Sequence, residues 1–126
     1  MTERGKIVSR QNERIREAKK LGQRKYREQR GLFLVEGVRL VEEALAAGAV
    51  EQLFFTERLL ASPRGQVLVS RAEARGVQLF ACSEGVLVEL TDTVQAQGVV
   101  AVARKPSWPQ PAPGVLVIAD EIQDPG

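Results

Sequence analysis

The spacing of apolar residues changes from strand-like to helix-like at one point in the first third of the chain. Residues 32–35 form a short continuous apolar run, which is typical of a buried strand. Apolar residues then recur at helical spacing over residues 38–45. The pattern predicts that a strand gives way to a helix at Glu36 and Gly37. Such junctions lie at the carboxyl end of a strand, where open α/β sheets bind ligands. A βα unit with an ordinary turn glycine is the alternative interpretation.

The same succession of patterns continues along the chain. Three further apolar runs have the length of strands, at residues 52–56, 77–81 and 98–103. Helical patterns occupy residues 10–21, 23–30, 63–75 and 83–90. Ser9, Ser62 and Ser83 precede three of these patterns and are expected to be N-caps. The alternation predicts an α/β fold: a three-layer α/β/α sandwich with a mostly parallel four-stranded sheet and a basic N-terminal helix.

The chain changes character after the fourth predicted strand. Four prolines surround Trp108 within residues 106–113, a density that predicts a semi-rigid linker. Another apolar run follows at residues 115–119. We therefore expect four parts: a basic helical arm (1–30), an α/β domain (31–104), a linker (105–114), and the first strand of a further, truncated domain (115–126).

Composition narrows the chemistry that this chain can perform. It has 126 residues, 44% of them hydrophobic, and no apolar run approaches the roughly 20 residues that span a bilayer. It has no histidine, which excludes Ser-His and Cys-His catalysis, and a single cysteine, Cys82, which excludes an internal disulfide. Neither histidine-containing nor all-cysteine zinc sites can form. We expect a cytoplasmic protein without a metal site and without membrane association.

The positive charge is concentrated at the amino end. Residues 1–30 contain eleven basic and four acidic side chains, so their net charge is +7. The whole chain has a net charge of +2, so the remaining residues have a net charge of −5. A one-signed excess of this kind favours binding to a polyanion, most often nucleic acid. The candidate contacts in this arm are Arg10, Lys20, Arg24, Lys25, Arg27 and Arg30. A solvated charged helix is the alternative.

Four segments, in order, resemble the N-terminal part of SpoU/TrmH-family RNA ribose 2′-O-methyltransferases of the SPOUT superfamily. They are Ile7-Val8-Ser9-Arg10-Gln11-Asn12 before a basic helix, Phe33-Leu34-Val35-Glu36-Gly37 with Arg39, the segment 93–102 with Gln97-Gly98, and Asp120-Glu121-Ile122-Gln123-Asp124-Pro125-Gly126. Each segment alone is a weak signal, whereas the four in this order are specific.

The resemblance implies a substrate-binding domain similar to ribosomal proteins that bind kinked RNA. In the family this domain is joined to a knotted, usually dimeric domain that binds S-adenosylmethionine. Structured RNA is the expected partner, ribosomal RNA ahead of transfer RNA. The resemblance and the strand-end position add a second set of candidate RNA contacts: Glu36, Gly37, Arg39, Thr93, Gln97 and Gly98.

The catalytic and cofactor-binding residues of the family follow its Asp120–Gly126 motif. We therefore expect none in this chain, and we expect the chain alone to be inactive. Two other hypotheses compete with a methyltransferase's RNA-recognition domain. One is a stand-alone RNA-binding module like a ribosomal protein, and the other is a protein-interaction domain whose basic arm docks an acidic partner.

Overall fold

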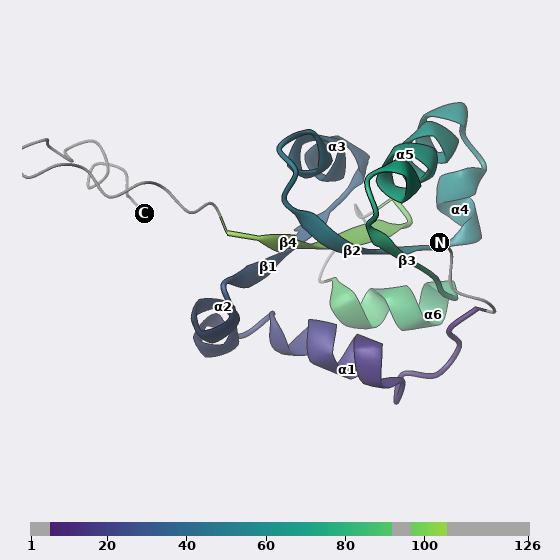
Figure 1. Ribbon diagram of the computed structural model, residues 1–126. Coiled ribbons are helices and arrows are strands. Elements are labelled where there is room, and N and C mark those ends of the chain that lie inside the picture. Colours follow the sequence, from purple (N-terminus) through teal and green to yellow (C-terminus); the bar gives the residue numbers. More distant parts are fainter. Residues whose placement is uncertain (1–5, 92–96, 106–126) are drawn as a thin grey trace, which may run out of the picture.

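The computed structural model describes residues 6–91 and 97–105, which form a sheet between two helical layers (Figure 1). Two helices precede the sheet, and the remaining helices connect its strands. In chain order the elements are α1 (Glu13–Lys20), α2 (Arg24–Arg30), β1 (Leu32–Glu36), α3 (Val38–Ala46), β2 (Val50–Phe55), α4 (Glu57–Leu60), α5 (Pro63–Ala74), β3 (Gln78–Ala81), α6 (Glu84–Leu87), the 3-10 helix η1 (Val88–Leu90) and β4 (Val99–Arg104). The predicted strand-to-helix junction at Glu36 and Gly37 is confirmed.

The sheet is mixed, so the prediction of a mostly parallel sheet was wrong. Its strand order is β1-β4-β2-β3. β2 and β3 pair in parallel, but β4 is antiparallel to both of its neighbours, β1 and β2. The last strand therefore lies inside the sheet and leaves β1 at its edge.

The reversed direction of β4 follows from the route of the chain after β3. α6 and η1 run beneath the sheet and end at Leu90. The hydroxyl of the next residue, Thr91, donates to Glu36 at the carboxyl end of β1. β4 thus begins at the carboxyl end of the other strands, where Gly37 N–H donates to Val99 O (3.2 Å). A strand starting there can only run back toward their amino ends. The apolar pattern of residues 98–103 predicts a strand but carries no information about its direction.

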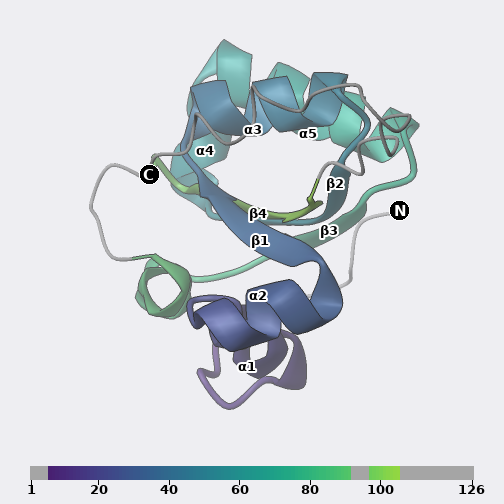
Figure 2. The same ribbon diagram turned by 90° about the vertical axis from the view of Figure 1, so that its left-hand side faces the viewer.

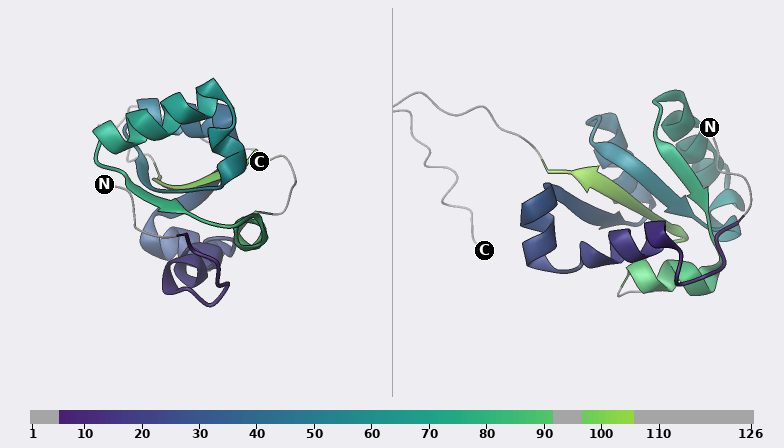
Figure 3. Two further views of the ribbon diagram at one scale, coloured as in Figure 1. Left: turned by 90° about the vertical axis from the view of Figure 1, so that its right-hand side faces the viewer. Right: turned by 60° about the horizontal axis from the view of Figure 1, so that its bottom comes forward.

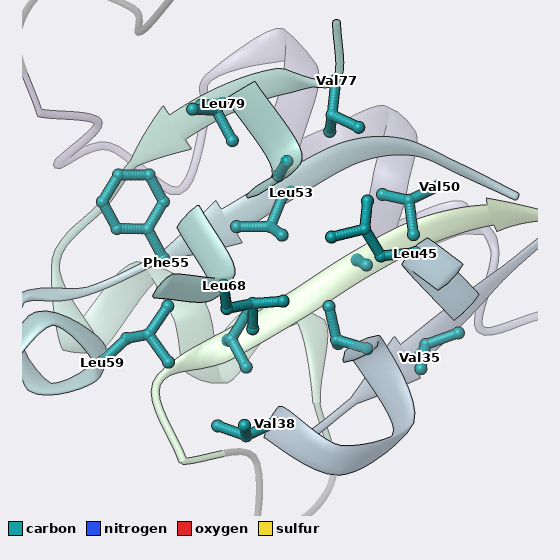
Figure 4. Packing of buried hydrophobic residues seen from close by; sticks show 14 of the residues in the cluster. Val35, Val38, Leu45, Val50, Leu53, Phe55, Leu59, Leu68, Val77 and Leu79 are labelled. Atoms are coloured by element: carbon teal, nitrogen blue, oxygen red, sulfur yellow. The ribbon is translucent and has the colours of Figure 1, made fainter. Parts of the chain in front are cut away.

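One face of the sheet packs against α3, α4 and α5. Figure 4 shows the inward side chains of this layer converging between the helices and the sheet. Val41, Leu53, Leu79 and Val99 are completely buried there. The helix α5 begins as predicted, because the Ser62 hydroxyl accepts from Gly65 N–H (3.1 Å) and proline occupies the first turn.

The opposite face packs against α1, α6 and η1. Figure 3 shows α1 and α6 lying beside each other under the sheet. Phe54 and Phe80 stack with ring centroids 5.2 Å apart, and Ile15 of α1 is completely buried against this cluster. The basic helix α1 is therefore fixed to the body by a narrow apolar stripe, while its charged sides face outward.

The N-cap of α1 differs from the prediction. Asn12, rather than Ser9, caps the helix by accepting from Arg14 N–H (2.8 Å), while the Ser9 hydroxyl accepts from Gln11 N–H (3.0 Å) in the preceding turn. Both residues are favourable caps, so sequence alone did not distinguish them. The predicted Ser83 cap of α6 is confirmed by its bond from Val86 N–H (3.3 Å).

Several expectations fall outside the described residues: Thr93, the proline-rich stretch with Trp108, the apolar run 115–119, and the Asp120–Gly126 motif. The division of the chain into four parts and the likeness to ribosomal proteins that bind kinked RNA stay predictions. No helix in the described ranges is both long and apolar enough to cross a membrane.

Candidate nucleic-acid interface

The helices α1 and α2 carry most of the predicted arm contacts, and glutamates partly neutralise them. Glu17 holds Lys20 (3.2 Å) and Arg30 (2.8 Å), and Arg24 pairs with Glu28 (3.0 Å). The hydrogen bond from Lys20, followed by that from Arg30, lowers the pKa of Glu17. Residues 13–30 nevertheless contain eight basic and three acidic side chains, so this surface stays positive.

Tyr26 gathers three of the arm cations around one half-buried ring. Lys25 lies 5.1 Å, Arg30 5.4 Å and Lys20 5.7 Å from the ring centroid. The ring also packs against the apolar cluster between the sheet and α1, α6 and η1, so this tyrosine anchors the arm to the body. Cations held over an aromatic face are positioned without losing their charge, so they can still meet phosphate.

The other two arm candidates have different surroundings. Arg10 lies 3.5 Å from Glu89, which also accepts from Lys19 at 2.7 Å. The hydrogen bond from Lys19 lowers the pKa of Glu89. Arg27 donates to Leu21 O (3.1 Å) and so ties α2 to the end of α1. Arg27 thus has a structural role in addition to its charge.

The second candidate set is partly assembled at the carboxyl end of β1. Gln97 Oε1 accepts from Val38 N–H (2.9 Å) and caps α3, whose own N-cap residue, Gly37, has no side chain. Gly98 follows with φ +80°, and its carbonyl accepts from Thr56 N–H (3.0 Å). The structure therefore brings Glu36 and Gly37 together with Gln97 and Gly98, although the two pairs are about 60 residues apart in the sequence.

Arg39 lies apart from that assembly. Its side chain is 82% exposed on α3 and pairs with Glu43 (3.5 Å), one turn further along the same helix. Arg39 is therefore accessible to a ligand but is not held toward the strand end.

A groove of about 870 Å³ joins the two candidate sets along the open edge of β1. Leu21, Leu34 and Leu90 supply its apolar wall. Arg27 and Lys105 line it near the amino end of β1, and Glu36, Glu89 and Lys19 line it toward the other end. Figure 2 shows α2 beneath β1, on the side where the groove lies.

Sequence reasoning missed the groove residues Lys19, Leu34, Glu89 and Lys105. Lys19 is part of the arm, but nothing in the sequence distinguished it from the neighbouring Lys20 as a candidate contact. Lys105 was assigned to the linker, yet its N–H donates to Gly31 O (2.9 Å) and continues the β1–β4 ladder. Its position could be recognised only after β4 was known to lie beside β1.

The only cysteine offers no nucleophile. Cys82 is buried, and burial raises the pKa of its thiol to about 12, so the thiol stays protonated at neutral pH. Within residues 6–91 and 97–105, no group of three or more acidic, histidine or cysteine side chains could hold a metal ion. The described surface therefore offers groups for binding and no thiolate for covalent catalysis.

The cap provided by Gln97 leads to a stability prediction. Replacing Gln97 by alanine should lower the free energy of unfolding by about 1 kcal/mol, because Val38 N–H loses its acceptor. Urea denaturation of the 126-residue chain would measure the change. Gln29, an exposed residue of α2, provides the control Gln29→Ala, which should change stability little. Equal effects of the two substitutions would show that the cap contributes nothing.

Taken together, the fold and its surface define a three-layer α/β domain with a positive helical pair beside the open edge of its sheet. Residues 12–101 match the family model of the MRM3-like substrate binding domain, and the chain belongs to that family. The resemblance to the N-terminal domain of SpoU/TrmH-family RNA methyltransferases is thereby confirmed.

Relatives and solved structures agree with this assignment. The chain is 34% identical, over 95% of its length, to an uncharacterized tRNA/rRNA methyltransferase of Synechocystis. It is 29% identical, over 95%, to the 23S rRNA (guanosine(2553)-2′-O)-methyltransferase RlmP of Bacillus subtilis. A crystal structure of an RNA 2′-O ribose methyltransferase superposes on 89% of the chain with a TM-score of 0.68 and 33% identity.

These proteins are longer than the chain. It spans 44% of the Synechocystis relative, 46% of RlmP and 43% of the superposed crystal structure. Another similar structure is the SpoU methyltransferase AviRb of Streptomyces viridochromogenes, solved in complex with the cofactor AdoMet. It is 28% identical, with a TM-score of 0.61, and the chain covers 34% of it.

Proposed function

We propose that this chain is the RNA-recognition domain of an S-adenosylmethionine-dependent RNA ribose 2′-O-methyltransferase. The observation that carries the proposal is the match of residues 12–101 to a substrate-binding domain. The positive surface of α1 and α2 supports it, because phosphate contacts hold RNA in register for a reaction at one ribose. Structured ribosomal RNA is the proposed substrate, since RlmP is named for 23S rRNA.

Binding to a labelled RNA stem-loop, followed by fluorescence anisotropy, tests this function. An acidic protein whose net charge matches that of the RNA stem-loop serves as the competitor. We expect saturable RNA binding that the acidic protein does not displace. Displacement by the protein at equal concentration would favour the protein-interaction hypothesis. A stand-alone RNA-binding module would also bind RNA, so binding alone does not distinguish that hypothesis. Methylation of the RNA by the whole protein does distinguish it, because a stand-alone binding module would not methylate RNA.

We further propose that catalysis and dimerisation belong to other parts of a longer cytoplasmic protein. The extent of the relatives beyond the matched region supports this division. S-adenosylmethionine would supply the methyl group there. The residues described here contribute RNA positioning: cations of α1 and α2 hold phosphates, and the carboxyl end of β1 presents backbone groups close to the RNA.

The division predicts that the 126-residue chain does not bind S-adenosylmethionine. Isothermal titration of the chain with the cofactor should give no saturable heat, because the proposed site lies in another domain. The same chain should bind the RNA stem-loop in a parallel titration, which shows that the sample is folded and active. Saturable cofactor binding in the micromolar range would place the site in this chain and contradict the division.

A further inference from the structure

The open edge of β1 presents unpaired backbone groups to the groove. Gly31 O accepts from Lys105 N–H, and Gly37 N–H donates to Val99 O, so the odd-numbered residues of β1 exchange hydrogen bonds with β4. In an antiparallel pair the alternate residues point their N–H and C=O groups away from the partner strand. Leu34 therefore directs a donor and an acceptor toward the groove. Among the described residues, none bonds to these two groups.

The groove also combines apolar surface with charges of defined position. Leu34, Leu21 and Leu90 line it, and the partly exposed Leu34 offers the most surface to a flat ring, because Leu21 and Leu90 are each only 3% exposed. Arg27 and Lys105 lie at one end, near the positive surface of α2. A carboxylate, Glu89, lies toward the other end and is fixed by Lys19 at 2.7 Å. An apolar wall with a few placed polar groups is the usual composition of a small-ligand site.

We propose that this groove binds one unpaired nucleotide of the RNA substrate, an inference that rests on the proposed function. The base lies against the leucine wall, and the N–H and C=O groups of Leu34 pair with its edge. Arg27 and Lys105 hold the adjoining phosphate. Proteins recognise RNA sequence mainly at unpaired bases, because the edges of paired bases in a duplex are poorly accessible.

Charge and position favour a nucleotide over an extended peptide, which could also pair with an open strand edge. The groove contains three cations and two carboxylates, and it adjoins a helical pair with eight basic and three acidic residues. An RNA whose phosphates lie on α1 and α2 can therefore reach the groove without crossing an acidic surface. The groove adjoins the Gly37–Gln97 assembly, because Glu36 lines it at the carboxyl end of β1.

Nuclear magnetic resonance of the 126-residue chain tests the proposal without a mutation. Two RNA duplexes of the same sequence are compared, one with a single-nucleotide bulge and one fully paired, because the loop of a hairpin would itself offer unpaired nucleotides. We expect the Leu34 amide and the methyl groups of Leu21 and Leu90 to shift with the bulged RNA alone. The amides of Arg24 and Lys25 should shift with both RNAs.

The possible outcomes separate this proposal from the function on which it rests. Arm shifts without groove shifts would overturn the groove site and leave RNA binding intact. No shift anywhere would overturn RNA binding itself. Groove shifts with an extended peptide but not with bulged RNA would assign the edge to a protein strand. Tighter binding of a nucleoside monophosphate than of the bulged RNA would assign it to a free nucleotide.

A charge reversal gives a second measurement. Lys105→Glu should weaken binding of the bulged RNA about fivefold more than binding of the paired RNA, as expected for one partly exposed charge contact. Arg71→Glu, on the exposed side of α5, makes the same change in net charge on the opposite helical layer. It should affect both RNAs alike. If the two variants change the ratio of the affinities for the bulged and the paired RNA equally, the proposed phosphate contact at Lys105 is wrong.

Discussion

Replacing Arg24 and Lys25 by alanine should flatten the salt dependence of RNA binding by about 1.5 in the slope of log affinity against log salt. Each phosphate contact contributes about 0.7 to 0.9 to this slope, through release of counterions. If about four phosphates are contacted, the unmodified chain should show a slope of about −3 to −4. Both side chains are exposed, so their loss should leave the fold intact.

The double variant should bind all structured RNAs more weakly, because phosphate contacts carry little sequence information. Arg27 is left unchanged, since its bond to Leu21 O joins α2 to α1. The matched control is Arg64→Ala with Arg71→Ala, which removes the same charge from α5 on the opposite layer. Its slope should equal that of the unmodified chain. An unaltered slope in the arm variant, with folding verified by circular dichroism, would mean that the arm is only a solvated surface.

Replacing Gly98 by alanine should lower the free energy of unfolding by about 3 kcal/mol. Two effects combine at this position. Its φ of +80° is costly for a residue with a side chain, by about 1 kcal/mol. A Cβ atom would also lie 2.8 Å from the hydroxyl of the buried Thr56 and 3.0 Å from Leu59 N, which adds an overpacking cost of about 1–3 kcal/mol.

Gly76 provides a control that separates the two effects. Its φ is +79°, and a Cβ atom there would meet nothing within 4 Å. Gly76→Ala should therefore show only the backbone cost, about 1 kcal/mol. Urea denaturation of both variants gives the difference. If the two substitutions are equally destabilising, close packing at Gly98 contributes nothing to the free energy of unfolding. The glycine would then be required only for its backbone conformation.

Local features of the fold could be predicted from the sequence. Ser62 and Pro63 identify the start of α5 because a cap and a first-turn proline act within one helical turn. The strand-to-helix junction at Gly37 was equally local. The direction of β4 could not be predicted, because it depends on the path of α6 and η1 under the sheet rather than on the residues of β4.

The candidate site shows the same limit. The charge count identified α1 and α2 as the positive surface but not which cations would be paired with Glu17 or Glu89. Gln97 was selected from a family motif as an RNA contact. The structure shows that its side chain caps α3, a contact between residues 59 positions apart that no local pattern contains. RNA contact at Gln97 stays a prediction.

The central position of β4 has a consequence for the order of events during synthesis. β1 and β2 leave the ribosome well before β4, yet β4 is the strand that joins them. Until Arg104 has emerged, β1 has no partner strand in the sheet. The apolar clusters on both faces of the sheet also lack the buried side chains of β4. Contacts between residues so distant in sequence also slow folding. The domain should therefore fold in one late step, and a nascent chain that pauses before residue 99 would expose its apolar surfaces to chaperones and proteases.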